Sequence, residues 1–104
     1  SPETMRDVIK VSSGRSYAFE AKVDKFILAN QFNGGFAVDL QFKDLGLALD
    51  AGKDVSTPLP MTALATQVFG AARAKGLNKQ DISSVIKVWE DLTGVEVRSQ
   101  LDEA

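Results

Sequence analysis

Residues 33 to 50, NGGFAVDLQFKDLGLALD, join a glycine pair to the longest uninterrupted helical pattern of the chain. Asn33, Gly34 and Gly35 predict a turn, because these residues accept positive φ angles more readily than others do. After the turn, apolar residues recur with the spacing of one face of an α-helix; they are Val38, Phe42, Leu45 and Leu49. The stretch therefore predicts a central helix around which the rest of the chain is organised.

The central helix is apolar around much of its girth, since Leu40, Leu47 and Ala48 widen the apolar face. A helix of this kind is expected between other elements rather than on the outside of the molecule. Lys43 and Asp44 interrupt it with two adjacent charges. We expect these charges to point toward solvent, a partner or a ligand.

The composition excludes several kinds of chemistry. The 104 residues suffice for one domain with a single core but are few for an enzyme with its own cofactor fold. The chain has no cysteine and no histidine, which excludes disulfides, thiol nucleophiles, serine-histidine-aspartate triads and the usual zinc ligands. Its 12 basic and 14 acidic residues form no run of one sign, and no apolar run reaches the roughly 18 residues of a membrane span. We therefore expect no metal, nucleic acid or membrane as a partner.

Four further segments have the periodicity of amphipathic helices. They run over residues 2 to 11, from a cap at Ser16 to about Ala29, from Pro60 to about Lys75, and from a cap at Asn78 or Asp81 to Gly94. Residues 95 to 104 are mostly polar and are expected to form a frayed tail. No alternating strand pattern of useful length occurs, so the sequence predicts an all-α bundle of about five helices.

Several motifs follow one another along the chain: SSGRS at residues 12 to 16, FNGGFAVDLQFKDLGLALD at 32 to 50, PLP at 58 to 60 and AKGLNKQDISSV at 74 to 85. In this order and spacing they resemble the C-terminal helical domain of the β-hydroxyacid dehydrogenases. That family includes 3-hydroxyisobutyrate dehydrogenase and tartronate semialdehyde reductase, and the closing WEDLTGVEV resembles the latter branch slightly more. The resemblance implies one helical domain over residues 1 to 98, of the 6-phosphogluconate dehydrogenase C-terminal type, followed by a tail over residues 99 to 104.

The resemblance also implies roles for three residues of the central stretch. In the family, the phenylalanine of the Gly-Gly-Phe turn and the aspartate of the Lys-Asp pair lie at the substrate pocket, which implies substrate contacts for Phe36 and Asp44. The family's neighbouring lysine reaches the bound NAD or NADP, which implies a cofactor contact for Lys43. The alternatives are a solvated helix face for Lys43 and Asp44, and ordinary core packing for Phe36.

The family's catalytic lysine and its glycine-rich cofactor domain lie upstream of the part that this chain resembles. No lysine of the chain takes the catalytic position, because Lys10 and Lys22 stand in another context and Lys43 matches another position. The resemblance thus implies a fragment of an NAD(P)-dependent oxidoreductase that interconverts a small 3-hydroxy acid and its semialdehyde. The fragment alone is expected to be inactive and to hold no cofactor.

A second hypothesis is a helical dimerisation or interaction module without chemistry. Helical domains of the family pack on one another in dimers and tetramers, so we expect a homo-oligomer, with association through the central and fourth helices. The expected compartment is the cytoplasm, or the mitochondrial matrix for a eukaryotic chain.

Overall fold

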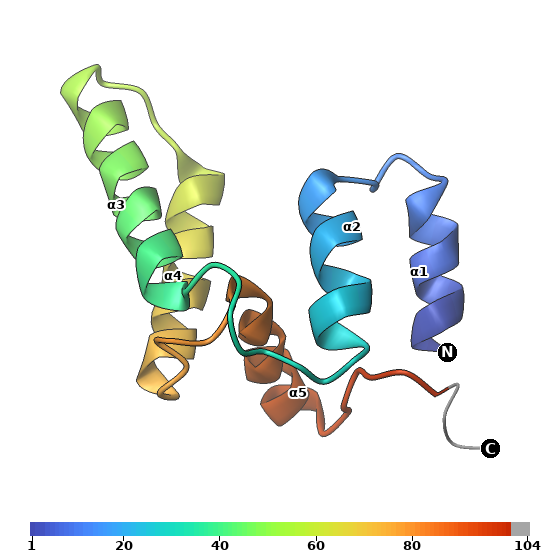
Figure 1. The fold of residues 1–104 in the computed structure, drawn as a ribbon. Coiled ribbons are helices and arrows are strands. Elements are labelled where there is room, and N and C mark those ends of the chain that lie inside the picture. The colour runs from blue at the N-terminus through green and yellow to red at the C-terminus, as the bar shows by residue number, and fades with distance from the viewer. Residues whose placement is uncertain (101–104) are drawn as a thin grey trace.

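The computed structural model describes residues 1–100, which form helices joined by short loops (Figure 1). The elements in chain order are α1 Pro2–Lys10, α2 Tyr17–Lys22, the π-helical turn η1 Val23–Ile27, α3 Val38–Asp54, α4 Pro60–Ala74, the 3-10 turn η2 Ile82–Val85 and α5 Ile86–Thr93. Five α-helices and no strand occur in residues 1–100, which confirms the all-α prediction for this part of the chain. The closer likeness to the 6-phosphogluconate dehydrogenase domain stays a prediction. None of the helices within residues 1–100 combines the length and apolar character that crossing a membrane requires.

The predicted helix ends agree with the structure where a local cap decides them. The side chains of Ser1 and Ser16 each accept a hydrogen bond from the backbone N–H three residues further on, at 3.2 and 3.0 Å. Asp81, rather than Asn78, caps the last helical segment. Gly94 ends α5 with a φ of +73°, a conformation that glycine adopts without strain.

The second predicted helix changes its pitch partway along. At η1 the backbone N–H of Leu28 donates to the carbonyl oxygen of Val23 at 2.8 Å, which is a π-helical bond. The wider turn directs Phe26 into the interior, where it is 6% exposed. Its ring lies beside the backbone of Gly35, in the turn that precedes α3.

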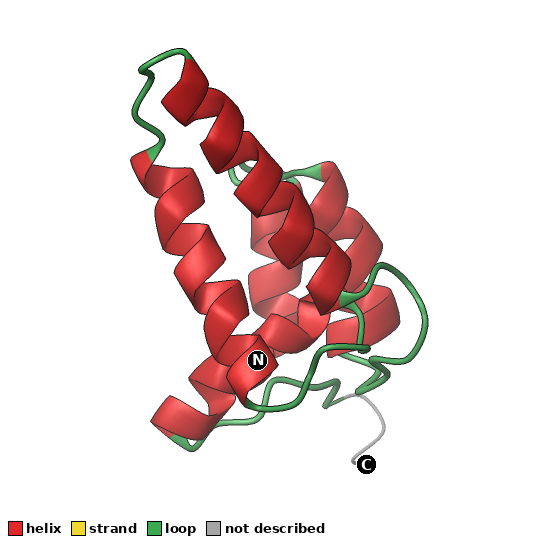
Figure 2. Cartoon of the chain, turned by 90° about the vertical axis from the view of Figure 1, so that its left-hand side faces the viewer, coloured by secondary structure: helices red, strands yellow, loops and turns green. Residues whose placement is uncertain are grey.

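The two longest helices, α3 and α4, form an antiparallel hairpin that projects from the rest of the molecule (Figures 1 and 2). Pro60 starts α4 at its first helical position, as the sequence predicts. The hairpin loop folds back tightly over Gly52, where an added Cβ would lie 2.7 Å from Leu59 Cδ1 and 2.9 Å from the oxygen of Thr57. The missing side chain of this glycine therefore permits the close turn.

The expectation that the central helix is enclosed by other elements is wrong for the described chain. Within α3 only Val38 and Gly52 are buried, and Leu40 and Leu47 are 44% and 59% exposed. The reason is that α4 and η2 pack against one side of α3 and leave its opposite side open.

One buried apolar cluster lies where α3, α4 and α5 meet. Val38, Ala72 and Leu77 are its buried members, with Phe69 and Val88 packed around them. Two backbone hydrogen bonds fasten the start of α3 to the loop after α4: the N–H of Val38 donates to the oxygen of Gln80 at 2.9 Å, and the N–H of Asp39 to that of Asn78 at 3.1 Å. The beginning of the central helix is thus the best-anchored part of the hairpin.

The first helix, α1, lies beside α2 (Figure 1), and a polar contact joins it to η1. Arg6 Nη1 donates to Asp24 Oδ1 at 2.7 Å. The predicted apolar stripe of α1 is largely uncovered in residues 1–100, because Met5 and Val8 are 62% and 56% exposed.

The C-terminal segment, residues 95–100, runs from α5 past α2 to α1 (Figure 1). The N–H of Val97 donates to Glu90 Oε2 at 2.6 Å, and the N–H of Ser99 to the carbonyl oxygen of Leu28 at 2.7 Å. The N–H of Gln100 donates to Glu3 Oε1 at 2.7 Å. The expectation of a frayed tail is therefore wrong for residues 97 to 100, because the backbone N–H groups of three of these residues donate hydrogen bonds to carboxylates and to a carbonyl oxygen. The rest of the predicted tail, residues 101 to 104, lies outside the described residues.

Candidate functional site

Lys43 and Asp44 lie side by side on the open side of α3. Their side chains are 63% and 50% exposed, and Lys43 Nζ lies 3.6 Å from Asp44 Oδ1. An exposed ion pair of this length contributes no more than about 1 kcal/mol, because water and salt screen it. Both groups can therefore exchange this contact for a ligand at little cost.

Two leucines flank this pair on the same face of the helix. Leu40 and Leu47 stand three or four residues from the pair on either side, which places all four side chains on one stripe. We call Leu40, Lys43, Asp44 and Leu47 the α3 face. It combines an exposed cation and carboxylate with two exposed apolar side chains, as a surface that contacts a partly apolar, charged ligand requires.

Phe36 lies in the turn immediately before α3, with its side chain outside the core. The residue is 37% exposed, so the alternative of ordinary core packing is wrong for the described chain. Its backbone is held on both sides: its N–H donates to Asp81 Oδ1 at 2.8 Å, and its carbonyl oxygen accepts from the N–H of Ile82 at 2.8 Å. The backbone of this partly exposed residue is thus held in place on both sides.

The three predicted site residues share one end of the hairpin but do not touch. Within the described residues, Lys43 and Asp44 pair with each other, and no hydrogen bond or ion pair joins either side chain to Phe36. At a rise of about 1.5 Å per residue, the pair stands on the order of 8 Å along the helix from its first residue, Val38.

A buried carboxylate that the sequence did not single out for a site lies directly behind Phe36. Asp81 is 0% exposed and accepts four hydrogen bonds. Its Oδ1 accepts from Lys22 Nζ at 2.6 Å and from the N–H of Phe36 at 2.8 Å; its Oδ2 accepts from the N–H of Ser83 at 2.9 Å and from Ser83 Oγ at 2.5 Å.

These donors decide the ionisation of Asp81. Burial by itself raises the pKa of this carboxyl group, but the hydrogen bonds from Lys22, Ser83 and Phe36 outweigh burial and hold the pKa below its usual value. Asp81 is therefore a carboxylate at neutral pH. The sequence predicts Asp81 as a helix cap and gives Lys22 no catalytic role. It carries no signal for the ion pair between them, because the two residues are 59 positions apart.

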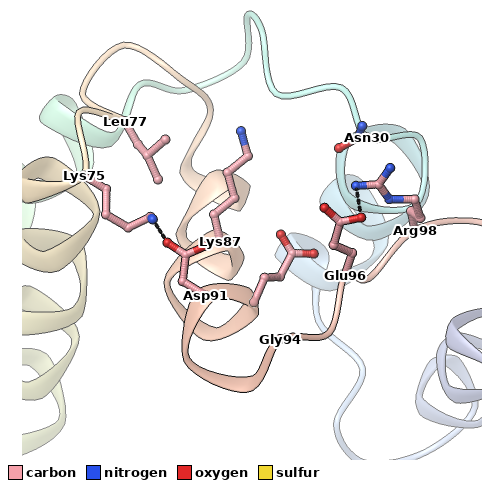
Figure 3. Close-up of a pocket in the computed structure, with 9 residues that line it drawn as sticks. Asn30, Lys75, Leu77, Lys87, Asp91, Gly94, Glu96 and Arg98 are labelled. Carbon is pink, nitrogen blue, oxygen red and sulfur yellow. Dashed lines mark ion pairs between the residues drawn. The ribbon is translucent and has the colours of Figure 1, made fainter.

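A cavity lies elsewhere, between α5, the end of α4 and the C-terminal segment (Figure 3). It has a volume of about 760 Å³, and its lining includes none of the three predicted site residues. Four of its six charged side chains form ion pairs: Lys75 contacts Asp91, and Arg98 Nη2 lies 2.7 Å from Glu96 Oε2. Three basic and three acidic side chains line this cavity, so its net charge favours neither an anion nor a cation.

No group of three or more carboxylate, histidine or cysteine side chains within residues 1–100 is arranged to hold a metal ion. The charged groups that the α3 face offers to a ligand are the ammonium group of Lys43, which donates hydrogen bonds, and the carboxylate group of Asp44, which accepts them.

A sequence model of the family described as "NAD-binding of NADP-dependent 3-hydroxyisobutyrate dehydrogenase" matches residues 1–89. This description assigns cofactor binding to the matched region. It does not confirm the expected position at the C-terminal end of a parent enzyme, which stays a prediction.

Named relatives agree with the family. The chain is 65% identical over 96 residues to 2-(hydroxymethyl)glutarate dehydrogenase of Eubacterium barkeri, covering 92% of this chain and 32% of that protein. It is 34% identical over 92 residues to mitochondrial 3-hydroxyisobutyrate dehydrogenase of Homo sapiens, covering 83% and 27%. The crystal structure of 3-hydroxyisobutyrate dehydrogenase from Salmonella typhimurium superposes with a TM-score of 0.78 at 34% identity, covering 84% of this chain and 30% of that one.

The chain thus spans about a third of the length of each of these relatives. The match over residues 1–89, together with the shared helical fold, places it in the family of the 3-hydroxyisobutyrate dehydrogenases and related hydroxyacid dehydrogenases.

Proposed function

We propose that this chain is the helical C-terminal part of an NAD(P)-dependent dehydrogenase that interconverts a 3-hydroxy acid and its semialdehyde. The observation that carries the proposal is the uncovered α3 face, with an exposed Lys43–Asp44 pair beside the anchored, exposed Phe36. The absence of any strand in residues 1–100 supports the assignment to the helical part, because a dinucleotide fold needs parallel strands. Relatives about three times as long have room for that fold outside the matched region.

The names of the relatives support a substrate class. 2-(Hydroxymethyl)glutarate and 3-hydroxyisobutyrate both carry a hydroxymethyl group on the carbon next to a carboxylate, and they differ in the other substituent, which is carboxyethyl or methyl. The 65% identity to the Eubacterium barkeri protein favours the dicarboxylate for the parent of this chain. 3-Hydroxyisobutyrate and tartronate semialdehyde are the competing substrates in the assay below.

The roles follow from the chemistry of each group. Lys43 donates hydrogen bonds to a phosphate or ribose hydroxyl of NAD(P), which supplies the hydride acceptor when bound. Asp44 accepts a hydrogen bond from the substrate hydroxyl or orients the lysine of the parent that takes the hydroxyl proton. The ring of Phe36 covers the reacting carbon against water.

Substitutions in the full-length parent test these roles. Lys43→Ala is expected to raise KM for NAD(P) at least tenfold, a loss of about 1.4 kcal/mol of binding, and Asp44→Ala is expected to lower kcat/KM for the hydroxy acid. Lys53 and Asp54 repeat the Lys-Asp dipeptide at the far end of the same helix, so Lys53→Ala and Asp54→Ala are matched controls. The measurement is steady-state kinetics with all three substrates.

Equal kinetics for the Lys43→Ala and Lys53→Ala proteins would contradict the proposal. That result favours the second candidate, a helical dimerisation or interaction module, which the exposed apolar residues of α3 and α4 support; they include Leu47, Met61 and Leu64.

A further inference from the structure

We propose that Asp81 and Lys22 are positioning residues for the substrate site, because their part-buried ion pair holds the backbone of Phe36 in the place from which its ring reaches substrate. This inference rests on the proposed function of Phe36 and adds two residues to the site. Neither of them lies in the central stretch, and neither is expected to touch substrate.

The two oxygens of the Asp81 carboxylate have separate tasks. Oδ2 accepts both hydrogen bonds from Ser83 and so caps η2. Oδ1 accepts from Lys22 Nζ and from the N–H of Phe36, so the ammonium group and the Phe36 backbone meet at one atom. One oxygen therefore serves the helix cap, and the other serves the predicted site.

The turn before Phe36 is shaped to receive that oxygen. Gly35 has a φ of +67°, and a Cβ at this residue would lie 2.1 Å from Asp81 Oδ1 and 3.0 Å from Phe26 Cζ. The N–H of Ile82 fixes the carbonyl oxygen of Phe36 from the same segment. Phe36 can consequently change its backbone position only if Asp81 moves or releases it.

Lys22 supplies the charge that Asp81 needs. A fully buried carboxylate without a partner is strongly destabilising, and Lys22, whose side chain is 20% exposed, provides that partner. Its Nζ also lies 4.5 Å from the centroid of the Phe26 ring. Lys25 Nζ lies 5.6 Å from the same ring but forms no ion pair with Asp81, which makes Lys25 a matched control.

Asp81→Asn in the full-length parent separates positioning from stability. An amide has one acceptor oxygen in place of two, so either Phe36 or Ser83 loses its hydrogen bond, and the attraction of Lys22 weakens. Because a misplacement of about 1 Å costs on the order of a hundredfold in rate, we expect kcat/KM for the hydroxy acid to fall between tenfold and a hundredfold. KM for NAD(P) should stay within about twofold of the wild-type value, because Lys43 lies within α3 and not in the turn that holds Phe36.

Ser83→Ala is the control for the structural role, since it removes a hydrogen bond from Oδ2 alone. We expect it to lower the melting temperature but to leave kcat/KM within about twofold of the wild type. A double-mutant cycle with Phe36→Ala supplies the decisive readout: if Asp81 acts through Phe36, adding Asp81→Asn to Phe36→Ala causes no further loss of kcat/KM.

The outcomes are distinguishable. If Phe36→Ala leaves kcat/KM unchanged, the proposed function of Phe36 is wrong and the inference falls with it. If Phe36→Ala impairs kcat/KM but Asp81→Asn does not, or if their losses multiply, the positioning role alone is overturned. If Asp81→Asn does not fold, Lys22→Gln takes its place with Lys25→Gln as control, and equal kcat/KM for these two proteins overturns the inference.

Discussion

Gly35 is constrained in two independent ways, by a φ of +67° and by Asp81 Oδ1, which occupies the space where a Cβ would stand. Its neighbour Gly34 has a similar φ of +78° but open space where a Cβ would stand. A side chain at Gly34 would therefore meet only the strain of the backbone conformation, whereas a side chain at Gly35 would also meet a steric clash. From the sequence, both are simply residues of one turn.

Alanine at each glycine should resolve the two costs. Gly34→Ala is expected to lower the free energy of unfolding by about 1 kcal/mol, which is the strain of positive φ for a residue with a Cβ. Gly35→Ala should lower it by at least about 2 kcal/mol more, because Asp81 must also be displaced and loses hydrogen bonds while buried. Urea denaturation of both proteins measures the difference, and equal losses would show that the contact with Asp81 is relaxed cheaply.

At the scale of the elements, local signals and distant contacts differ in what the sequence predicts. Helix periodicity, the serine caps and Pro60 act within a few residues, so they located α1, α3 and α4 well. The Lys22–Asp81 pair and the docking of the C-terminal segment join residues far apart in the chain, for which a single sequence carries no periodic signal. Residues 33 to 50 predict the central helix. They do not predict the backbone hydrogen bonds that hold the start of this helix against the loop after α4.

The attachment of the C-terminal segment to α1 is expected to depend on pH through Glu3. Hydrogen bonds from the Ser99 side chain and from the N–H of Gln100 hold the pKa of Glu3 below its ordinary value of 4.5. Because the pKa is lowered on folding, this stabilisation is complete above 4.5 and is lost as the pH falls through the lowered pKa. Amide hydrogen exchange at Gln100 should accelerate in that range relative to the core amide of Val38.

Glu3→Gln should show fast exchange at Gln100 throughout the pH range, because the neutral amide binds this N–H more weakly. Glu20→Gln, which changes an exposed carboxylate paired with Arg15, is the control. Slow exchange at Gln100 in the Glu3→Gln protein at neutral pH would be incompatible with attachment through this carboxylate.

The described chain is more extended than a compact domain of its length. The Cα radius of gyration is 15.1 Å, whereas a compact domain of this length has a value of about 13 Å. The projecting α3–α4 hairpin accounts for the elongated shape, with extents of 54 by 32 by 25 Å (Figure 1). Its uncovered leucines are the surface that a second copy of the chain or the remainder of a parent enzyme would cover.

We expect the isolated chain to dimerise through this hairpin, because burying Leu47 and Leu64 removes apolar surface from water at roughly 25 cal/mol per Å². Leu47→Lys and Leu64→Lys should shift the sedimentation equilibrium toward monomer by at least about tenfold in dissociation constant. Val11→Lys, at an exposed apolar residue beyond α1, should leave it unchanged. A strictly monomeric wild-type chain at high concentration would contradict this prediction.

The hydrogen bond from the N–H of Gln100 to Glu3 also bears on how the chain folds. It joins positions 97 residues apart, so nearly the entire polypeptide must be gathered before it can form. Local helices form in microseconds, whereas contacts between distant positions carry the entropy of closing a long loop and slow the search. Docking of the C-terminal segment on α1 is therefore expected to be the last event of folding and the first of unfolding.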